Sequence, residues 1–301
     1  MFKYVNSGFN LISDLEFPFF SPFDGAERTE ITIKAGNISD KFSAFSRPGA
    51  YFMPEKVLFY NDFCYMIINS DGIVYENRKE HSQGLTTFIS GYGLALLFHI
   101  RGEIGIHAGA ISDGENIFLI SGYSGAGKSS VTANLLERGL KLAADDMVRT
   151  KKESNALFAY PSFPMQKLCV NELFLRGIDF SDLKPVDGED DKFFVPVNDR
   201  SESNKLPVKS LIFIKKADVD ELKIRILSGK ELLKVFSDCV FILHLSDTEF
   251  NKPEFMIRLL KHLECIKVYE IERPEDKNTL NEVTEIVDKL IKGDDSRCYL
   301  S

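Results

Sequence analysis

The sequence lacks the features that mark secreted and membrane-spanning proteins. Its five cysteines are scattered, odd in number and never spaced as CxxC, which excludes a disulfide framework and argues against a zinc site. The longest apolar stretch, near LALLFHI, is too short to cross a bilayer. The first residues, MFKYVNSGFN, have no signal-peptide pattern. We therefore expect a soluble cytoplasmic protein with reduced thiols.

An excess of positive charge is also lacking. Lysine and arginine number 37 against 45 aspartates and glutamates, for a net charge of -8. Nucleic acids and anionic membranes both require a positive surface, so we expect neither as a partner. The 44% hydrophobic and 27% charged residues are typical of a globular protein. A chain of 301 residues is long enough for one large or two modest domains.

Residues 1–88 are predicted to form a small β-rich N-terminal domain. Asn61-Asp62 and Ser70-Asp71-Gly72 are typical turn residues between short β-branched and aromatic runs, so a meander is expected. The runs are ITIKAG (31–36), KVLFYND (56–62), CYMIINS (64–70) and IVYENR (73–78).

Residues 89–301 are predicted to form an α/β domain. Residues 86–101 have helical apolar spacing, with Gly102 as a stop. EIGIHAGAIS (103–112) and IFLIS (117–121) are expected to be hairpin-linked strands. A helix ending at Gly139 and the short strand LKLAA follow. Strands are then expected at SLIFIKK and LKIRIL. Helices are expected near 230–238, 253–263 and 279–292, and they alternate with the segments CVFILHL and IKVYEI.

One long segment, residues 180–205, is polar, acidic and contains two prolines. Its composition favours a mobile loop that closes over a ligand.

A phosphate-binding loop is the most specific motif in the chain. Gly122, Gly127, Lys128 and Ser129 fit G-x-x-x-x-G-K-[ST], with a predicted strand before them and a predicted helix after them. The glycines allow a nest of backbone N–H groups around phosphates, the lysine reaches the β/γ oxygens and the serine can ligate Mg²⁺. The predicted nucleotide-binding residues are Gly122, Tyr123, Ser124, Gly125, Ala126, Gly127, Lys128, Ser129 and Ser130.

Two adjacent carboxylates follow the loop unusually early. Asp145 lies 17 positions after Lys128 (145 − 128), which leaves room for one helix, one turn and one strand. If LKLAA lies beside IFLIS, Asp145 and Asp146 emerge at the sheet edge that holds the phosphates. One carboxylate would hold Mg²⁺, and the other would accept the proton of an incoming hydroxyl. The alternative is a solvated turn or a helix N-cap.

His107 lies in the predicted strand that precedes IFLIS. A hairpin would bring it alongside the strand that leads into the phosphate loop, where it would hydrogen-bond an aspartate and adjust its pKa. The alternative is a packed or exposed bystander.

Together these residues resemble a known family. HAGAI, a short turn, a strand, GYSGAGKS and then LLERGLKLAADD are similar to the catalytic core of the HPr kinase/phosphorylase group. The segment AYPSFPMQKL (159–168) resembles stand-alone members of that group, which also carry a β-rich N-terminal part. The segment NELFLRGIDF has Glu172, Arg176 and Gly177, but departs from the family's E-x-R-G-x-G spacing.

The resemblance implies a P-loop kinase core of the HPr kinase / phosphoenolpyruvate carboxykinase type that uses ATP and Mg²⁺ to phosphorylate a serine hydroxyl. It implies residues 122–130 as the phosphate loop, His107 and Lys128 as active-site residues, Asp145 as the base and Ser129 with Asp146 as the metal ligands. It also implies a protein or peptide acceptor and a possible homo-oligomer. Whether Glu172 binds metal, and whether Lys192 contacts phosphates or is merely solvated, stays open.

Three functions are compatible with these residues. The first is a kinase acting on a hydroxyl of a protein or peptide. The second is a kinase acting on a small hydroxyl compound such as free serine, and the third is a nucleotide-binding regulatory protein without transfer. The combination of His107, Lys128, Asp145 and Asp146 favours transfer, because a protein that only binds nucleotide needs no base.

Overall fold

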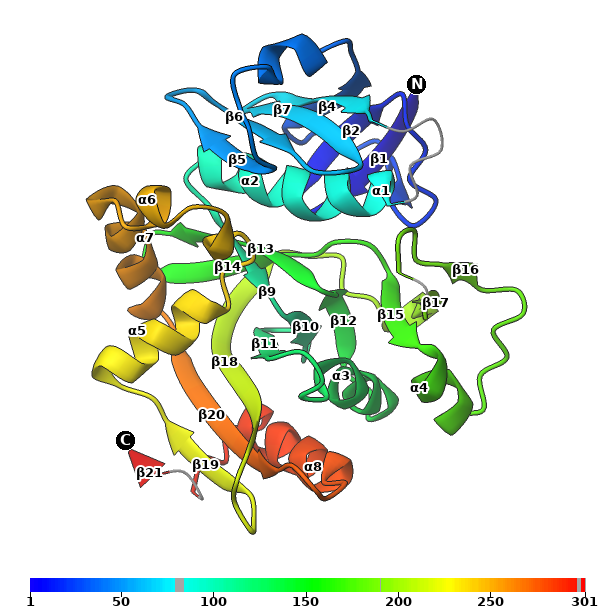
Figure 1. Ribbon diagram of the computed structural model, residues 1–301. Coiled ribbons are helices and arrows are strands. Elements are labelled where there is room, and N and C mark those ends of the chain that lie inside the picture. The colour runs from blue at the N-terminus through cyan, green and yellow to red at the C-terminus, as the bar shows by residue number, and fades with distance from the viewer. Residues whose placement is uncertain (79–83, 190, 297–298, 301) are drawn as a thin grey trace.

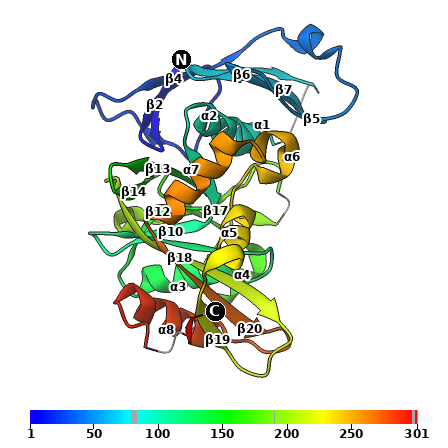
Figure 2. The same cartoon turned by 90° about the vertical axis from the view of Figure 1, so that its left-hand side faces the viewer.

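The computed structural model describes residues 1–78, 84–189, 191–296 and 299–300, which form a mixed α/β structure. An N-terminal sheet and a larger second sheet lie on opposite sides of a helical run (Figures 1 and 2). In the described part of the chain, no helix has the length and apolarity needed to cross a membrane. Cys64, Cys169, Cys239 and Cys265 are free thiols, and Cys298 lies outside the described residues.

The N-terminal sheet confirms the expected strands. Three of them, β6, β7 and β8, form the predicted antiparallel meander, and Asn61 and Asn69 accept backbone hydrogen bonds in its two turns. The sheet order is β3-β1-β2-β4-β8-β7-β6-β5. The strands are β1 (Phe2–Asn6), β2 (Phe9–Ser13), β3 (Ser21–Pro22), β4 (Glu30–Ala35), β5 (Gly49–Phe52), β6 (Lys56–Tyr60), β7 (Cys64–Asn69) and β8 (Gly72–Asn77), with a short helix η1 (Ser39–Phe42).

The predicted helix over 86–101 is present as α1 (Leu85–Phe88), the π-helical turn η2 (Ile89–Gly93) and α2 (Leu94–Ile100), and Gly102 follows with φ of 79°. Consecutive residues of α2 are buried, as expected for a helix covered on all sides. Phe98 packs on Phe9 of the N-terminal sheet, while Ala95 lies against Gly105 of the second sheet. The predicted domain boundary at 88/89 therefore falls inside one continuous helical run.

The second sheet carries the phosphate loop. Its main path is β12-β10-β11-β18-β14-β13-β9, and β20 pairs with β18 in parallel. The strands are β9 (Ile104–His107), β10 (Gly109–Ser112), β11 (Ile117–Gly122), β12 (Lys141–Ala144), β13 (Met147–Glu153), β14 (Ala156–Tyr160), β18 (Leu206–Ala217), β19 (Lys223–Ile226), β20 (Lys267–Pro274) and β21 (Tyr299–Leu300).

Helices cover both faces of this sheet. α3 (Lys128–Glu137) and α8 (Leu280–Ile291) pack on one face, through Val131, Leu135 and Val287. α5 (Gly229–Asp238) and α7 (Pro253–Leu263) pack on the other, and α6 (Asp247–Phe250) packs against α7. The segment CVFILHL is not a strand. It contains the short helix η4 (Leu243–Leu245) and contributes one isolated bridge, Val240 with Ile106.

The prediction of a mobile loop at 180–205 is wrong for the described residues, and Asp190 lies outside them. The segment contains β16 (Lys184–Pro185), β17 (Lys192–Pro196) and the short helix η3 (Asn198–Arg200). β17 pairs with β15 (Met165–Cys169), which leads into α4 (Val170–Leu175). Buried Phe194 stacks on Phe19 of the N-terminal part, and this aromatic packing orders the segment.

Candidate active site

The phosphate loop connects β11 to α3, and its glycines are sterically required. Gly122 has φ of 151°, and a Cβ there would lie 2.1 Å from the carbonyl oxygen of Ile214 on the neighbouring strand β18. Gly127 has φ of 98° and immediately precedes the first residue of α3. Only glycine adopts such a backbone at low cost. The loop therefore brings the N-terminal end of α3 to the edge of the sheet, a favourable place for an anion.

Lys128 folds back over the loop. Its Nζ donates to the carbonyl oxygens of Gly122, at 2.8 Å, and Tyr123, at 3.2 Å. Burial lowers the pKa of Lys128 from its ordinary value of 10.5, and the negative charge of Asp146 opposes that shift. A bound phosphate would give the ammonium group of Lys128 a negatively charged partner in place of these two carbonyl oxygens.

The other predicted loop residues differ in exposure. Tyr123, Ser124 and Gly125 are exposed, and the Tyr123 hydroxyl donates to Asp238. Ala126 is buried, and its carbonyl oxygen accepts a hydrogen bond from Arg273.

Ser129 and Ser130 have different surroundings. Ser129 lines a small cavity beside Lys128. Ser130 instead donates its hydroxyl hydrogen to Glu172 at 2.7 Å. Of the two, Ser129 is therefore placed to meet a phosphate or its cation, and the side chain of Ser130 is engaged elsewhere.

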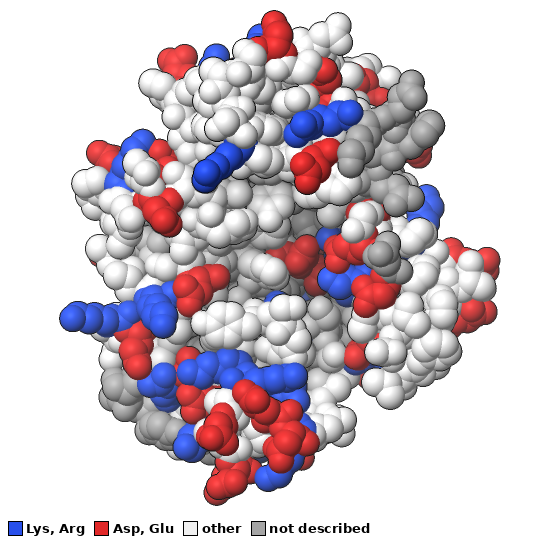
Figure 3. Space-filling model, in the orientation of Figure 1, with Lys and Arg blue, Asp and Glu red and all other residues white. Residues whose placement is uncertain are grey.

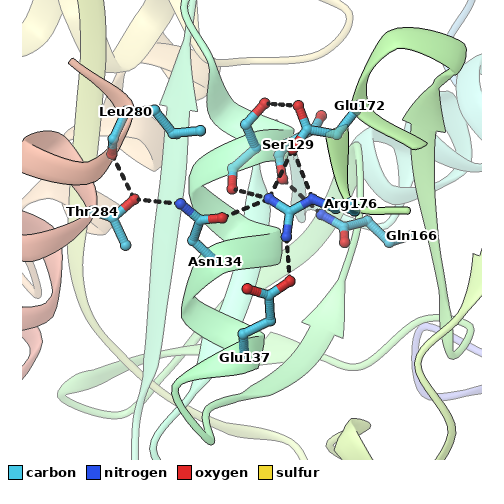
Figure 4. Close-up of polar contacts among 9 residues, drawn as sticks. Ser129, Asn134, Glu137, Gln166, Glu172, Arg176, Leu280 and Thr284 are labelled. Carbon is cyan, nitrogen blue, oxygen red and sulfur yellow. Dashed lines mark hydrogen bonds and ion pairs between the residues drawn. The ribbon is translucent and has the colours of Figure 1, made fainter. Parts of the chain in front are cut away.

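Glu172 belongs to a polar network behind the loop (Figure 4). Arg176 donates to Glu172, Asn134, Glu137 and the carbonyl oxygen of Ser130, and Asn134 donates in turn to Thr284 of α8. These bonds join α4, α3 and α8. Glu172 is thus occupied by Ser130 and Arg176, and it does not line the cavity that contains Ser129.

The aspartate pair follows β12, but β12 does not lie beside β11 as expected. β10 lies between them, because it pairs with both in antiparallel fashion. β12 and β11 therefore run in the same direction and end at the same edge. That geometry brings Asp145 and Asp146 next to the phosphate loop despite the different strand order.

The two carboxylates have different environments. Asp145 is only 6% exposed, and its Oδ2 accepts a hydrogen bond from the backbone N–H of Lys167 at 2.7 Å. Asp146 has φ of 69°, and its more exposed carboxylate lies 3.0 Å from Lys167 Nζ. Asp145 and Asp146 are not in a strand, so their side chains do not diverge by strand alternation. The left-handed backbone at Asp146 directs the two carboxylates apart instead.

These surroundings shift the two pKa values apart. Burial, followed by the negative charge of Asp146, raises the pKa of Asp145 to about 6. Burial would also raise the pKa of Asp146, but the charges of Lys167 and His107 outweigh it and lower that pKa. Asp145 is accordingly the carboxylate better matched to accept a proton near neutral pH, and Asp146 the one held as an anion.

His107 does reach the aspartate pair, by a route that differs from the prediction. The segment 103–112 is two strands, broken at Ala108, and only β10 forms the hairpin with β11. β9 pairs with β13 instead, with His107 opposite Met147. His107 Nε2 lies 3.5 Å from Asp146 Oδ1, and burial lowers the histidine pKa. The contact is with Asp146 and not with Asp145.

Five of the predicted residues line one cavity of about 30 Å³, here called the phosphate-side cavity: His107, Lys128, Ser129, Asp145 and Asp146. Figure 3 shows a hollow below the N-terminal part, with acidic and basic side chains gathered around it. The residues around the cavity are His107, Ala108, Gly109, Lys128, Ser129, Thr132, Asp145, Asp146, Lys167 and Lys192.

Lys167 is the main residue that the sequence did not reveal. It lies on β15 and contacts Asp146 and, at 3.7 Å, Glu189. Lys192 lies on the paired strand β17, opposite Cys169, and forms an ion pair with Glu189 at 2.6 Å. The one available signal was the position of Lys167 in the segment AYPSFPMQKL, which carried no motif for a cation.

A divalent cation would find few protein ligands here. Within the described ranges, no group of three or more His, Cys, Asp or Glu side chains is arranged to hold a metal ion. Ser129 and Asp146 both line the phosphate-side cavity, and they supply one hydroxyl and one carboxylate. Such a sparse oxygen set fits Mg²⁺, which usually keeps several waters and binds substrate phosphates.

No protein-family model matches the chain, and no curated protein matches it in sequence. Among solved structures, the chain is similar to the Hpr(Ser) kinase/phosphatase from Coxiella burnetii, with 16% sequence identity and a TM-score of 0.35. The match covers 64% of this chain and 94% of that one. This is a distant structural similarity, so the site itself has to support any functional assignment.

Proposed function

We propose that this protein is a kinase of the P-loop type, which transfers the γ-phosphate of ATP to a hydroxyl group in the presence of Mg²⁺. The observation that carries the proposal is the position of Asp145. A buried carboxylate with a pKa of about 6 shares one cavity with the lysine and serine of a phosphate loop. Phosphoryl transfer requires this pairing of a positioned base with a cationic phosphate site.

Each residue would have a distinct role. The backbone of residues 122–130 and Lys128 would bind the β- and γ-phosphates, and Lys167 and Lys192 would offset charge that develops on the transferred group. Ser129 and Asp146 would hold Mg²⁺, which supplies further charge neutralisation when bound. Asp145 would take the proton of the acceptor hydroxyl, while His107 and Lys167 keep Asp146 ionised.

The test is transfer of label from γ-labelled ATP. Purified protein with Mg²⁺ is incubated with a bacterial lysate, its small-molecule fraction and a serine-peptide pool. We expect Asp145→Asn to lower kcat by about 10²-fold or more, since general-base catalysis contributes about 10²–10⁴-fold, while ATP binding by calorimetry persists.

Asp113→Asn is the matched control. Asp113 accepts two backbone hydrogen bonds in a surface turn, and an asparagine oxygen accepts them equally well. This variant should transfer phosphate at the wild-type rate. ATP binding without transfer to any fraction would overturn the kinase proposal and favour a nucleotide-binding regulatory protein.

A further inference from the structure

Two lysines of the phosphate-side cavity are already paired with an anion of the protein itself. Glu189 Oε2 lies 2.6 Å from Lys192 Nζ, and Glu189 Oε1 lies 3.7 Å from Lys167 Nζ. Both lysines line the cavity, whereas Glu189 lies outside its wall. One carboxylate therefore bridges two of the cations that are proposed to meet a phosphate.

The backbone that carries this carboxylate is a tight turn between β16 and β17. The N–H of Val186 donates to the carbonyl oxygen of Lys192 at 2.8 Å, and the N–H of Glu189 donates to that of Val186 at 3.0 Å. Gly188, inside the turn, has φ of 81°, which glycine adopts at low cost. These bonds close the turn without help from the two ion pairs.

A second set of contacts attaches the turn to the start of the central helical run. The Asp187 carboxylate accepts hydrogen bonds from the backbone N–H of Gly84 and, at 3.1 Å, from the hydroxyl of Thr86. Its carbonyl oxygen accepts one of 2.6 Å from the hydroxyl of Thr87. Gly188 approaches the helix so closely that a Cβ there would lie 3.0 Å from the Cα of Gly84. The turn is thus anchored on α1, and its second carboxylate is held within reach of the lysines.

The two anions that contact Lys167 differ in their proposed roles. Burial would lower the pKa of Lys167, but the charges of Asp146 and Glu189 outweigh it and raise that pKa. Asp146 is the proposed metal ligand, whereas Glu189 has no part in the proposed transfer. A phosphate that met both lysines would lie close to the Glu189 carboxylate, and like charges repel each other. Phosphate and Glu189 therefore compete for the same cations.

We propose that Glu189 is an internal competitor of the γ-phosphate, which holds Lys167 and Lys192 in the nucleotide-free protein and releases them when ATP binds. The inference rests on the proposed kinase function and adds a regulatory contact to the same site. Rotation of the Glu189 side chain is sufficient for release, because the Asp187 contacts hold the backbone of the turn. The contact is autoinhibitory, since a protein whose binding-competent state is only partly populated has a reduced apparent affinity.

The inhibition should depend on the γ-phosphate. In the proposed reaction Lys167 and Lys192 meet the transferred group, while the loop backbone and Lys128 also hold the β-phosphate. ADP lacks the γ-phosphate, so it can bind while both lysines stay paired with Glu189. The contact should therefore weaken the binding of ATP more than that of ADP.

Calorimetry tests the competition directly. The full chain is titrated, in the presence of Mg²⁺, with a non-hydrolysable ATP analogue and separately with ADP. We expect Glu189→Gln to lower the Kd of the analogue by about three- to tenfold, because one like charge is removed beside the phosphates, and to lower the Kd of ADP by less. The difference should shrink as salt is added. Glu189→Asp keeps the charge and should return the Kd toward the wild-type value.

Glu264→Gln is the matched control. Glu264 also pairs with a lysine, Lys152, at 2.9 Å, but its side chain is 65% exposed and neither residue lines the cavity. Both Kd values should equal those of the wild type.

Two results would overturn the inference while leaving the kinase proposal intact. They are equal Kd values of the ATP analogue for wild type and Glu189→Gln, and weaker binding by Glu189→Gln, which would make the glutamate a support for the lysines. Binding of ATP without transfer would instead overturn the kinase proposal alone. Absence of ATP binding in the wild type and in Glu189→Gln would overturn both.

Discussion

At the residue scale, the chemistry depends on how two adjacent aspartates are separated. The left-handed backbone at Asp146 turns one carboxylate toward Lys167 and His107 and leaves the other buried. When the surroundings of two neighbouring carboxylates shift their pKa values in opposite directions, the two residues can have different chemical roles. The sequence Asp145-Asp146 alone could not show which residue has which role, because the assignment depends on a lysine 21 positions further along the chain (167 − 146).

A pH profile tests this assignment. If Asp145 is the base, kcat/KM should rise about tenfold per pH unit below pH 6 and level off above it, since the carboxylate must be ionised to accept a proton. His107 also titrates and contacts Asp146, and burial lowers its pKa, so His107→Asn is the necessary control. The ascending limb should persist in that variant. If the rise in kcat/KM with pH disappears in His107→Asn, the titrating group is the histidine and not Asp145.

At the element scale, α3 is held from behind by α4 and α8. The side chain of Arg176 is 11% exposed and bonds to residues of both α3 and α4. Since α3 begins at Lys128, this clamp fixes the direction of the helix end that is proposed to face bound phosphates.

Removing the clamp should destabilise the protein. Arg176→Met leaves Glu172 buried without its cation, which costs about 3–5 kcal/mol in the free energy of unfolding. Arg138→Met is the matched control. Its side chain is 40% exposed and lies 3.4 Å from Asp288, so a change within about 1 kcal/mol is expected. Urea denaturation of the three proteins measures both values. Equal losses for the two variants would show that Arg176 has no special structural role.

The sequence predicted local elements better than their pairing. Four of the eight strands of the N-terminal sheet, the helix over 86–101 and the conformation of the glycine-rich loop follow from alternation, helical spacing and glycine positions. The insertion of β10 between β12 and β11 could not be predicted, because strand order depends on contacts between distant segments. β17 was missed because its short apolar run, KFFVP, lies among acidic and polar residues. Lys167 was missed for a different reason, because β15 reaches the site only by tertiary packing.

At the scale of the whole molecule, the two sheets share one core. Apolar residues of the N-terminal sheet, the central helical run and the second sheet belong to a single buried cluster. The bond from Arg149 to Ser7 crosses from the second sheet to the first, and Glu103, next to β9 of the second sheet, holds the Arg149 side chain in place. Continuous packing of this kind favours cooperative unfolding.

Calorimetry can test this coupling. We expect one unfolding transition for the whole chain, and a loss of about 3–5 kcal/mol in Arg149→Met, which leaves Glu103 buried without its bidentate partner. Lys151→Met is the matched control, because Lys151 approaches the same carboxylate at 3.7 Å but is 44% exposed. It should cost about 1 kcal/mol or less. Two separate transitions in the wild-type protein would contradict the shared core.

The bond from Arg149 to Ser7 has a consequence for redesign. It anchors the β1–β2 turn through a main-chain carbonyl, so the side chains at the tip of the turn are not needed for the attachment. Of the two residues at the tip, Gly8 has φ of 73°, and a Cβ there would lie 2.4 Å from the ring of Tyr160. A redesign of this turn would therefore vary Ser7 alone, with glycine, asparagine or aspartate as the tolerated residues, and would leave residues 122–130, encoded much later in the gene, unedited.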